Sequence, residues 1–239
     1  MSDSTVAQQY SRAMEVDRFA VGTLAALQPF GFTAENALSI VGVCRDEMMF
    51  PMEHALHQVW GSAFDMSSLA AMVFLGRSGL SAAAHHAPGA DGRKRFVNVV
   101  MPHIGLDSDG TSGVVMRAGQ TGPSTACGAL IGLLEQLRSG RYANDLDWDD
   151  VEMSLVAMLL SGHVGHDHDL DLWGLTDLAR RVATGEIVRL SADLLECADT
   201  DVAVFSCVLI HGPEGDRVVV HEASAWLGSN SERVTLVVE

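Results

Sequence analysis

Short apolar runs that alternate with helical patterns constrain the fold of this chain more than any other feature. Three runs have the length and composition of buried strands, at residues 38–44, 69–75 and 96–101. Helical patterns alternate with them, at residues 47–60, in the alanine-rich segment that ends at His85-His86, and at residues 125–137. Alternating strands and helices are typical of βα units, so we predict an α/β fold with a mainly parallel central sheet flanked by helices.

The two ends of the chain add further elements to this predicted core. Residues 1–30 have apolar side chains at helical spacing, so we expect an N-terminal helical arm there. The last hundred residues contain helical patterns at 148–161 and 172–183, strand patterns at 202–210 and 217–220, and a short edge strand at 234–238. Because no linker divides the sequence, we expect residues 1–239 to form a single domain.

Composition excludes several classes of partner. The net charge of −16 argues against nucleic acid, because phosphate contacts need clustered Lys and Arg. No apolar run approaches the roughly 20 residues that a membrane span needs. The first residues lack a secretory pattern, and the 4 cysteines are widely separated, as is usual in a reducing compartment. We therefore expect a cytoplasmic protein with no membrane segment.

Two cysteines and a histidine stand where predicted elements end or begin. Cys44 ends the first strand run and His103 follows the third, and the carboxyl ends of parallel strands meet at one edge of a sheet. Cys127 lies in the predicted helix at 125–137, where Ser124 or Thr125 would cap the helix and place the thiol in its first turn. Two thiolates and an imidazole suit Zn²⁺, and three protein ligands leave a fourth position open, as in catalytic zinc sites.

Asp46 follows Cys44 by two residues, so in an extended segment it projects to the same side. Its carboxylate could accept a hydrogen bond from water at the open position, could bind the metal and close the site, or could have no role at the metal, as a solvated acid or as a cap for the helix that begins at Glu47. These three interpretations remain open.

Other residues offer competing sites. His163, His166 and His168 form a short His/Asp-rich run that could bind metal loosely, and His54 and His57 share one face of a predicted helix. A thiol enzyme is a further alternative, with Cys127 as the nucleophile and His103 as its base.

Several uncommon strings in one order add a resemblance to this interpretation. They are Cys44-Arg45-Asp46-Glu47, Trp60-Gly61-Ser62-Ala63-Phe64, Val73-Phe74-Leu75-Gly76-Arg77-Ser78-Gly79-Leu80, His85-His86-Ala87-Pro88, Pro102-His103-Ile104 and Ala126-Cys127-Gly128-Ala129-Leu130. Between about residues 39 and 137 the sequence thus resembles the limiting-CO₂-inducible protein B/C family, whose fold and zinc site are like those of β-type carbonic anhydrases.

The resemblance implies a zinc-dependent carbonic anhydrase that hydrates CO₂ reversibly to bicarbonate. Zinc would be held by Cys44, His103 and Cys127, and would lower the pKa of a bound water so that hydroxide attacks CO₂. Asp46 would be the carboxylate beside the open position. His85 and His86 are candidates to line the cavity or to shuttle protons. The resemblance also suggests a homodimer, for which the N-terminal helices are suitable interface material.

One departure from the β-type pattern bears on activity. That pattern is Cys-x-Asp-x-Arg, in which the Arg holds the Asp away from the metal, whereas the fifth position here is Met48. Arg45, Arg77 and Arg117 are candidates to replace the missing Arg, and we favour Arg117. If no Arg engages Asp46, the chain could instead be an inactive, zinc-stabilised scaffold or partner subunit that binds CO₂ or bicarbonate.

Overall fold

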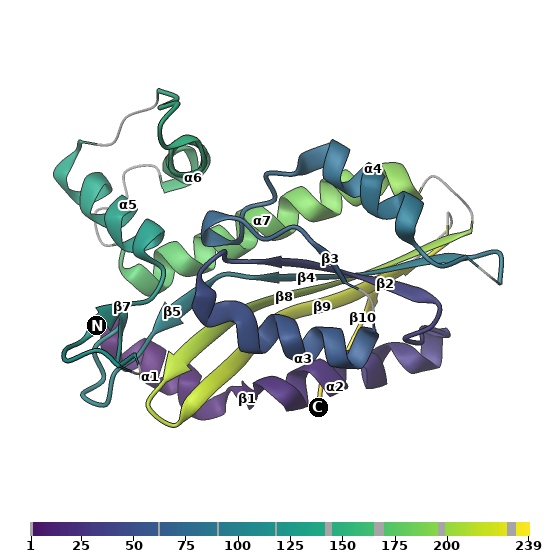
Figure 1. Ribbon diagram of the computed structural model, residues 1–239, viewed down its shortest axis with the longest axis horizontal. Coiled ribbons are helices and arrows are strands. Elements are labelled where there is room, and N and C mark those ends of the chain that lie inside the picture. The colour runs from purple at the N-terminus through teal and green to yellow at the C-terminus, as the bar shows by residue number, and fades with distance from the viewer. Residues whose placement is uncertain are drawn as a thin grey trace.

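The structure is a computed structural model that describes residues 2–61, 63–89, 91–117, 119–141, 145–164, 170–195, 199–228 and 233–239. A central sheet runs through the molecule and is flanked by helices (Figure 1), as the sequence predicts. Among the described residues, no helix is long and apolar enough to cross a membrane.

The sheet is mostly parallel, with an antiparallel hairpin toward one edge. Its strands follow the order β1-β9-β8-β4-β2-β3, and β5 and β10 pair with β8 and β9. The strand bounds are β1 Met14–Glu15, β2 Ala37–Val43, β3 Ala63–Asp65, β4 Lys94–Met101, β5 His103–Gly105, β8 Thr200–Gly212, β9 Gly215–Leu227 and β10 Arg233–Thr235. β2, β3, β4, β5 and β8 run in the same direction, whereas β9 returns antiparallel to β8.

The central strands are buried on both faces, which explains their continuous apolar character. In the register of the sheet, Val99 of β4 lies opposite Val41 of β2 on one side and Phe205 of β8 on the other. Successive residues of a strand face opposite sides, and β8 illustrates this. The Phe205 ring packs edge-on against Phe19 of one helical layer, while Ser206 hydrogen-bonds Arg180 of the other layer.

Two helical layers therefore cover the sheet. α2 (Val16–Leu27) and α3 (Phe50–Trp60) lie together on one face, joined by the indole N–H of Trp60, which donates to the Thr23 hydroxyl at 3.0 Å. α4 (Gly76–His86) and α7 (Leu172–Leu195) cover the other face. Figure 1 shows α5 (Gly128–Ser139) and α6 (Val151–Val164) at one end of the molecule, and α1 (Ser2–Arg12) near the β8–β9 turn.

The prediction of a strand at residues 69–75 is wrong. Leu69–Ala71 is a 3₁₀ turn, and Ala70 and Ala71 have positive φ values of 54° and 61°, which a strand cannot accommodate. The strand in this part of the chain is instead β3, whose three residues were too short a run to recognise. The predicted helix at 125–137 also begins later, because Ser124–Thr125 is a strand, β7, that pairs with β6 (Val114–Val115).

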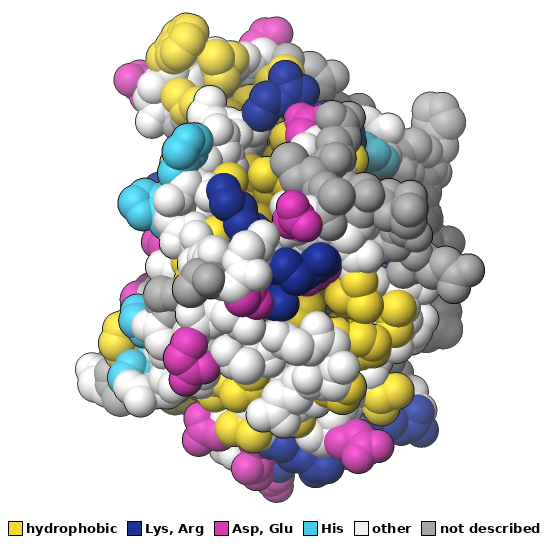
Figure 2. All heavy atoms as spheres, turned by 90° about the vertical axis from the view of Figure 1, so that its right-hand side faces the viewer, with side chains coloured by type: hydrophobic (Ala, Val, Ile, Leu, Met, Phe, Trp, Pro, Cys, Tyr) yellow, Lys and Arg dark blue, Asp and Glu magenta, His cyan; other side chains and the backbone are white. Residues whose placement is uncertain are grey.

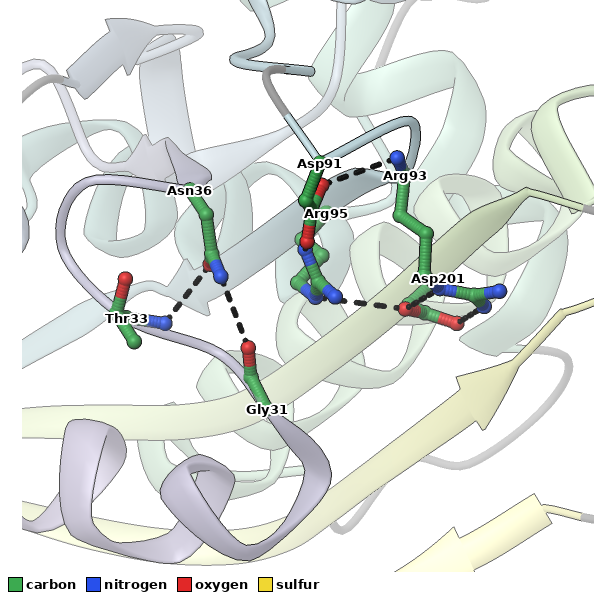
Figure 3. A network of polar contacts seen from close by, with 7 residues as sticks. All are labelled: Gly31, Thr33, Asn36, Asp91, Arg93, Arg95 and Asp201. Atoms are coloured by element: carbon green, nitrogen blue, oxygen red, sulfur yellow. Dashed lines mark hydrogen bonds and ion pairs between the residues drawn. The ribbon is translucent and has the colours of Figure 1, made fainter.

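A polar network closes the end of the sheet where the parallel strands begin (Figure 3). The carboxylate of Asp201, on β8, is almost fully buried; it accepts a hydrogen bond from Arg93 Nε at 3.0 Å and lies 3.6 Å from Arg95 Nε. Asp91 in turn accepts a hydrogen bond from Arg95 at 2.7 Å. Figure 2 views this end of the molecule and shows basic and acidic side chains interspersed among apolar ones. The arginines of the network pair with its aspartates and hold β4 against β8.

Candidate metal centre

Cys44, His103 and Cys127 lie together at the other end of the sheet, where the parallel strands finish. One ligand atom from each residue, the two Sγ atoms and an imidazole nitrogen, all lie within 4.8 Å of one another. All three side chains are buried, with residue exposures of 2%, 0% and 2%. The fold thus brings together residues that are separated by more than eighty positions in the sequence.

The parallel pairing of β2 and β4 places the first two residues. Cys44 follows β2 directly, and its N–H donates to the Met101 carbonyl at the end of β4. Pro102 interrupts β4 because it has no N–H to donate, and its carbonyl accepts a hydrogen bond from Leu209 of β8 at 3.0 Å. The chain then resumes as β5, which begins with His103.

Cys127 reaches the cluster through an unusual backbone conformation. It is the N-cap residue of α5, not a first-turn residue as expected, and has φ 57° and ψ 63°. Its carbonyl accepts hydrogen bonds from the N–H groups of Leu130 and Ile131. A non-glycine residue in the left-handed region is strained, and such strain concentrates at functional sites. Here it turns the thiol inward, toward Cys44.

The two thiols differ in acidity because one of them donates a hydrogen bond to the other. The pKa of Cys44 falls well below its ordinary value, chiefly because its thiolate accepts a hydrogen bond from the Cys127 thiol, with His103 adding to the effect. The pKa of Cys127 rises, first because of that bond to Cys44 and then because of burial. Without a cation the pocket therefore holds one thiolate readily and a second only at high cost.

The residues of the cluster fit a zinc ion. His103 Nε2 is buried and has no hydrogen-bond partner among the described residues, which is costly for a polar atom unless something else binds it. A divalent cation would bind this nitrogen and also stabilise both thiolates. Two sulfurs and one nitrogen are donors that zinc prefers.

Asp46 lies at the edge of the cluster and is held there by several contacts. Its Oδ2 is 3.8 Å from His103 Nε2, while its Oδ1 accepts a hydrogen bond from the Met48 N–H at 3.1 Å. Arg117 approaches the same Oδ1, with its Nη2 at 3.6 Å, and also contacts the Glu47 carboxylate and the Thr125 carbonyl. Asp46 therefore both caps the 3₁₀ turn Glu47–Met49 and faces the candidate ligands.

The other candidate arginines point elsewhere. Arg45 lies 2.9 Å from the Glu152 carboxylate and donates to the Ser67 carbonyl, and Arg77 lies 3.4 Å from Asp193. Of the three candidates, Arg117 is the one that the structure places beside Asp46.

Most of the remaining histidine candidates lie away from the cluster. His85 and His86 are exposed at the end of α4, near the start of β4, where Lys94 Nζ donates to the Ala84 carbonyl. They therefore stand at the opposite end of the sheet from His103, which argues against a role in lining the cavity. His54 and His57 are exposed on α3, and His163 is exposed on α6; His166 and His168 lie outside the described residues.

The arrangement does not favour the thiol enzyme. A cysteine nucleophile needs a lowered pKa, whereas the pKa of Cys127 is raised. Cys44 and Asp46, which that mechanism does not use, both lie at the same site.

Sequence reasoning missed two residues behind the cluster. His211 Nε2 lies 2.8 Å from His103 Nδ1, and Asp216 Oδ1 lies 2.8 Å from His211 Nδ1. Both belong to the β8–β9 hairpin, which the sequence predicted only as two strands and a turn. The signal that was available is a histidine and an aspartate at the two ends of a glycine-rich turn.

Comparisons with known proteins agree with this geometry. The family model for limiting CO₂-inducible proteins B/C beta carbonic anhydrases matches residues 13–227. The crystal structure of limiting CO₂-inducible protein LCIB superposes with a TM-score of 0.81 at 24% identity, covering 100% of both chains. That of PtLCIB4, a homologue of LCIB, gives a TM-score of 0.81 at 22% identity and covers 98% of each chain. At these identities the likeness shows the fold, and no curated protein matches the sequence.

Proposed function

Because this chain belongs to the limiting CO₂-inducible protein B/C family, we propose that it is a zinc-dependent carbonic anhydrase, which converts CO₂ and water reversibly into bicarbonate and a proton. The observation that carries the proposal is the convergence of Cys44, His103 and Cys127, whose ligand atoms lie within 4.8 Å of one another. The substrates of the proposed reaction are CO₂ and bicarbonate.

The proposal gives each residue of the site a role. Cys44, His103 and Cys127 would hold Zn²⁺ and leave a fourth position open. When bound, zinc would act as a Lewis acid that lowers the pKa of water at that position. Asp46 would accept a hydrogen bond from the reacting water through Oδ2, which faces His103. Arg117 would hold the carboxylate back through Oδ1, in place of the arginine that the β-type pattern has where this chain has Met48.

The test is stopped-flow CO₂ hydration by zinc-loaded protein, with Cys127→Ser as the blank. A rate well above the uncatalysed reaction, lost in the variant, is expected. No rate despite one zinc per chain would refute the proposed activity.

A second candidate is an inactive, zinc-stabilised scaffold or partner subunit that binds CO₂ or bicarbonate. The observation that favours it is the divided engagement of Arg117, whose guanidinium also contacts Glu47 and the Thr125 carbonyl. If these contacts prevail, Asp46 is free to swing onto the metal and close the site. This candidate predicts stoichiometric zinc with negligible turnover.

The proposal also extends to assembly and location. We propose a homodimer, in keeping with two exposed apolar side chains on the adjoining helices α2 and α3, Val21 at 59% and Phe50 at 66% exposure. Sedimentation velocity tests this, and a monomer at micromolar concentration would refute it.

We also propose a cytoplasmic location. Cys44, Cys127 and Cys207 are free thiols, which suits a reducing compartment such as the cytoplasm, and cell fractionation tests it.

A further inference from the structure

A hydrogen-bonded chain of three side chains leads from the candidate metal centre toward the surface. His103 Nδ1 lies 2.8 Å from His211 Nε2, and the two rings meet edge to face with centroids 5.0 Å apart. His211 Nδ1 lies 2.8 Å from Asp216 Oδ1. Both histidine side chains are almost fully buried, and Asp216 is about one-quarter exposed. We call these residues the His103–His211–Asp216 chain.

The carboxylate at the end of this chain fixes the positions of the protons within it. An ionised Asp216 can only accept, so His211 must donate through Nδ1–H. A neutral His211 then presents Nε2 as an acceptor, which requires His103 to donate through Nδ1–H. His103 is left with a bare Nε2, the same nitrogen that is buried without a hydrogen-bond partner in the part of the chain that the structure describes and that faces Asp46 across 3.8 Å.

The sheet itself places these residues. Asp216 of β9 is the antiparallel partner of His211 on β8, so the two side chains lie on the same face. β5 runs parallel to β8 and pairs Gly105 with His211, which brings His103 of β5 alongside. The register of these strands therefore builds the chain without help from a loop.

The N-terminal helix secures the hairpin that carries His211 and Asp216. Tyr10 of α1 donates its hydroxyl to the Gly215 carbonyl at 2.8 Å and accepts the Glu214 N–H at 3.1 Å. Arg217 lies over the Tyr10 ring, with its guanidinium carbon 5.2 Å from the ring centroid. Contacts with α1 thus fix the turn beside Asp216, which keeps the Asp216 carboxylate in place.

We propose that His211 and Asp216 are positioning residues, which hold His103 in the tautomer whose Nε2 binds the metal. This inference rests on the zinc-binding part of the proposed function, but not on CO₂ hydration. Outer partners of metal-binding histidines orient the ring and fix its tautomer, and their loss lowers metal affinity about 10–100-fold.

The first test is zinc affinity, measured by competition with a chromophoric chelator. Asp216→Asn keeps the shape of the side chain, but its amide can donate as well as accept, so it no longer fixes the direction of the hydrogen bonds. We expect zinc affinity to fall about 10–100-fold in Asp216→Asn, and to be recovered in large part by Asp216→Glu, which keeps a carboxylate. Glu214→Gln is the matched control. It also removes a carboxylate from this hairpin, but the Glu214 carboxylate contacts Arg217 and not His211.

The second test reads the tautomer directly in zinc-free protein labelled with ¹⁵N-histidine. From the hydrogen-bond geometry we expect His103 to carry a proton on Nδ1 in the wild type, and its protons to be redistributed between the two ring nitrogens in Asp216→Asn. His103→Gln assigns the signals. A wild-type proton on Nε2, or zinc affinity in Asp216→Asn within twofold of the wild type, would overturn the inference.

The two proposals fail in different ways. Wild-type protein that binds zinc, loses affinity in Asp216→Asn and does not hydrate CO₂ would support the positioning role and refute the proposed activity. Protein that hydrates CO₂ but binds zinc equally well with Asn at position 216 would refute the positioning role alone.

Discussion

At the scale of single residues, the candidate site depends on which oxygen of Asp46 is engaged. Oδ1 is held by the Met48 N–H and approached by Arg117, which leaves Oδ2 toward His103. The arginine comes from about seventy residues further along the chain, not from within the motif. The arginine beside this aspartate therefore comes from a second segment of the chain, whereas a Cys-x-Asp-x-Arg pattern carries both residues in one segment.

This arrangement predicts the effect of Arg117→Met. Without the guanidinium, Asp46 is free to move toward the metal, so CO₂ hydration should fall about 10–100-fold while zinc content is unchanged. The measurement is stopped-flow hydration together with metal analysis of the same sample.

Arg45→Met is the matched control for that experiment. Arg45 is adjacent to Asp46 in sequence, but it pairs with Glu152 instead, so its removal should leave hydration within about twofold of the wild type, as is usual for an exposed ion pair. Equal losses in the two variants would contradict the role given to Arg117.

The candidate ligands could be named from the sequence, whereas their supporting residues could not. Cys44 and His103 each follow an apolar run, and parallel strands bring such positions together. His211 and Asp216 depend on the pairing of β5, β8 and β9, a register that no local pattern encodes. The sequence also could not predict that Cys127 is the N-cap residue, because Ser124 and Thr125 are residue types that cap helices more often than cysteine does.

At the scale of elements, α7 is fixed to the sheet by a buried polar cluster. Arg180 donates to Asp177 at 2.8 Å and to the Ser206 hydroxyl of β8 at 2.7 Å, and Thr184 shares that hydroxyl. Burial acts to raise the pKa of Asp177, but the hydrogen bond from Arg180 and the charges of Arg180, His221 and Arg181 outweigh it, so the pKa is lowered.

The lowered pKa of Asp177 predicts a pH-dependent loss of stability in Asp177→Asn. A depressed folded-state pKa contributes stability above the unfolded value, near 3.9, and this contribution is lost as pH falls through the folded value. Asp177→Asn should therefore cost about 1.5–3 kcal/mol at pH 7, and the difference should shrink below about pH 4. Urea unfolding between pH 7 and pH 3.5 measures it.

Glu186→Gln serves as the control on the same helix. Glu186 pairs with Arg189 three residues later, as Asp177 pairs with Arg180, but the two side chains of the Glu186 pair are more exposed, at 39% and 59% against 24% and 9%. Its loss should cost under about 1 kcal/mol. An Asp177→Asn penalty that persists unchanged at pH 3.5 would contradict the electrostatic explanation.

The elements themselves were predictable where a run was long and of one type. β2, β4 and β8 are continuous apolar strands in a sheet covered on both faces, and all three were recognised. The segment 69–75 is equally apolar, but it is buried as a turn, and an apolar run alone cannot distinguish a strand from any other buried segment.

At the scale of the whole molecule, the candidate metal centre takes its three residues from different elements. Cys44 belongs to the end of β2, His103 to β5, and Cys127 to the start of α5. A cation held by all three would tie the sheet to the helical end of the molecule that carries α5 and α6 (Figure 1). Its binding energy would add to the folding free energy, because the unfolded chain has no such site.

Zinc removal should therefore lower the melting temperature. Free zinc at a hundredfold excess over its dissociation constant stabilises the folded state by about 2.7 kcal/mol, which corresponds to roughly 5–10 °C for a chain of this length. Calorimetry with and without chelator measures the shift, and Cys127→Ser should abolish most of it.

Cys207→Ser is the control for this experiment. The Cys207 thiol is also buried, and burial raises its pKa, but it lies on β8 outside the cluster. That variant should melt at a lower temperature yet keep the full zinc-dependent shift, since it alters the core and leaves the ligands in place. A shift lost equally from both variants would mean that zinc acts through thiols in general, and not through the site that the fold assembles.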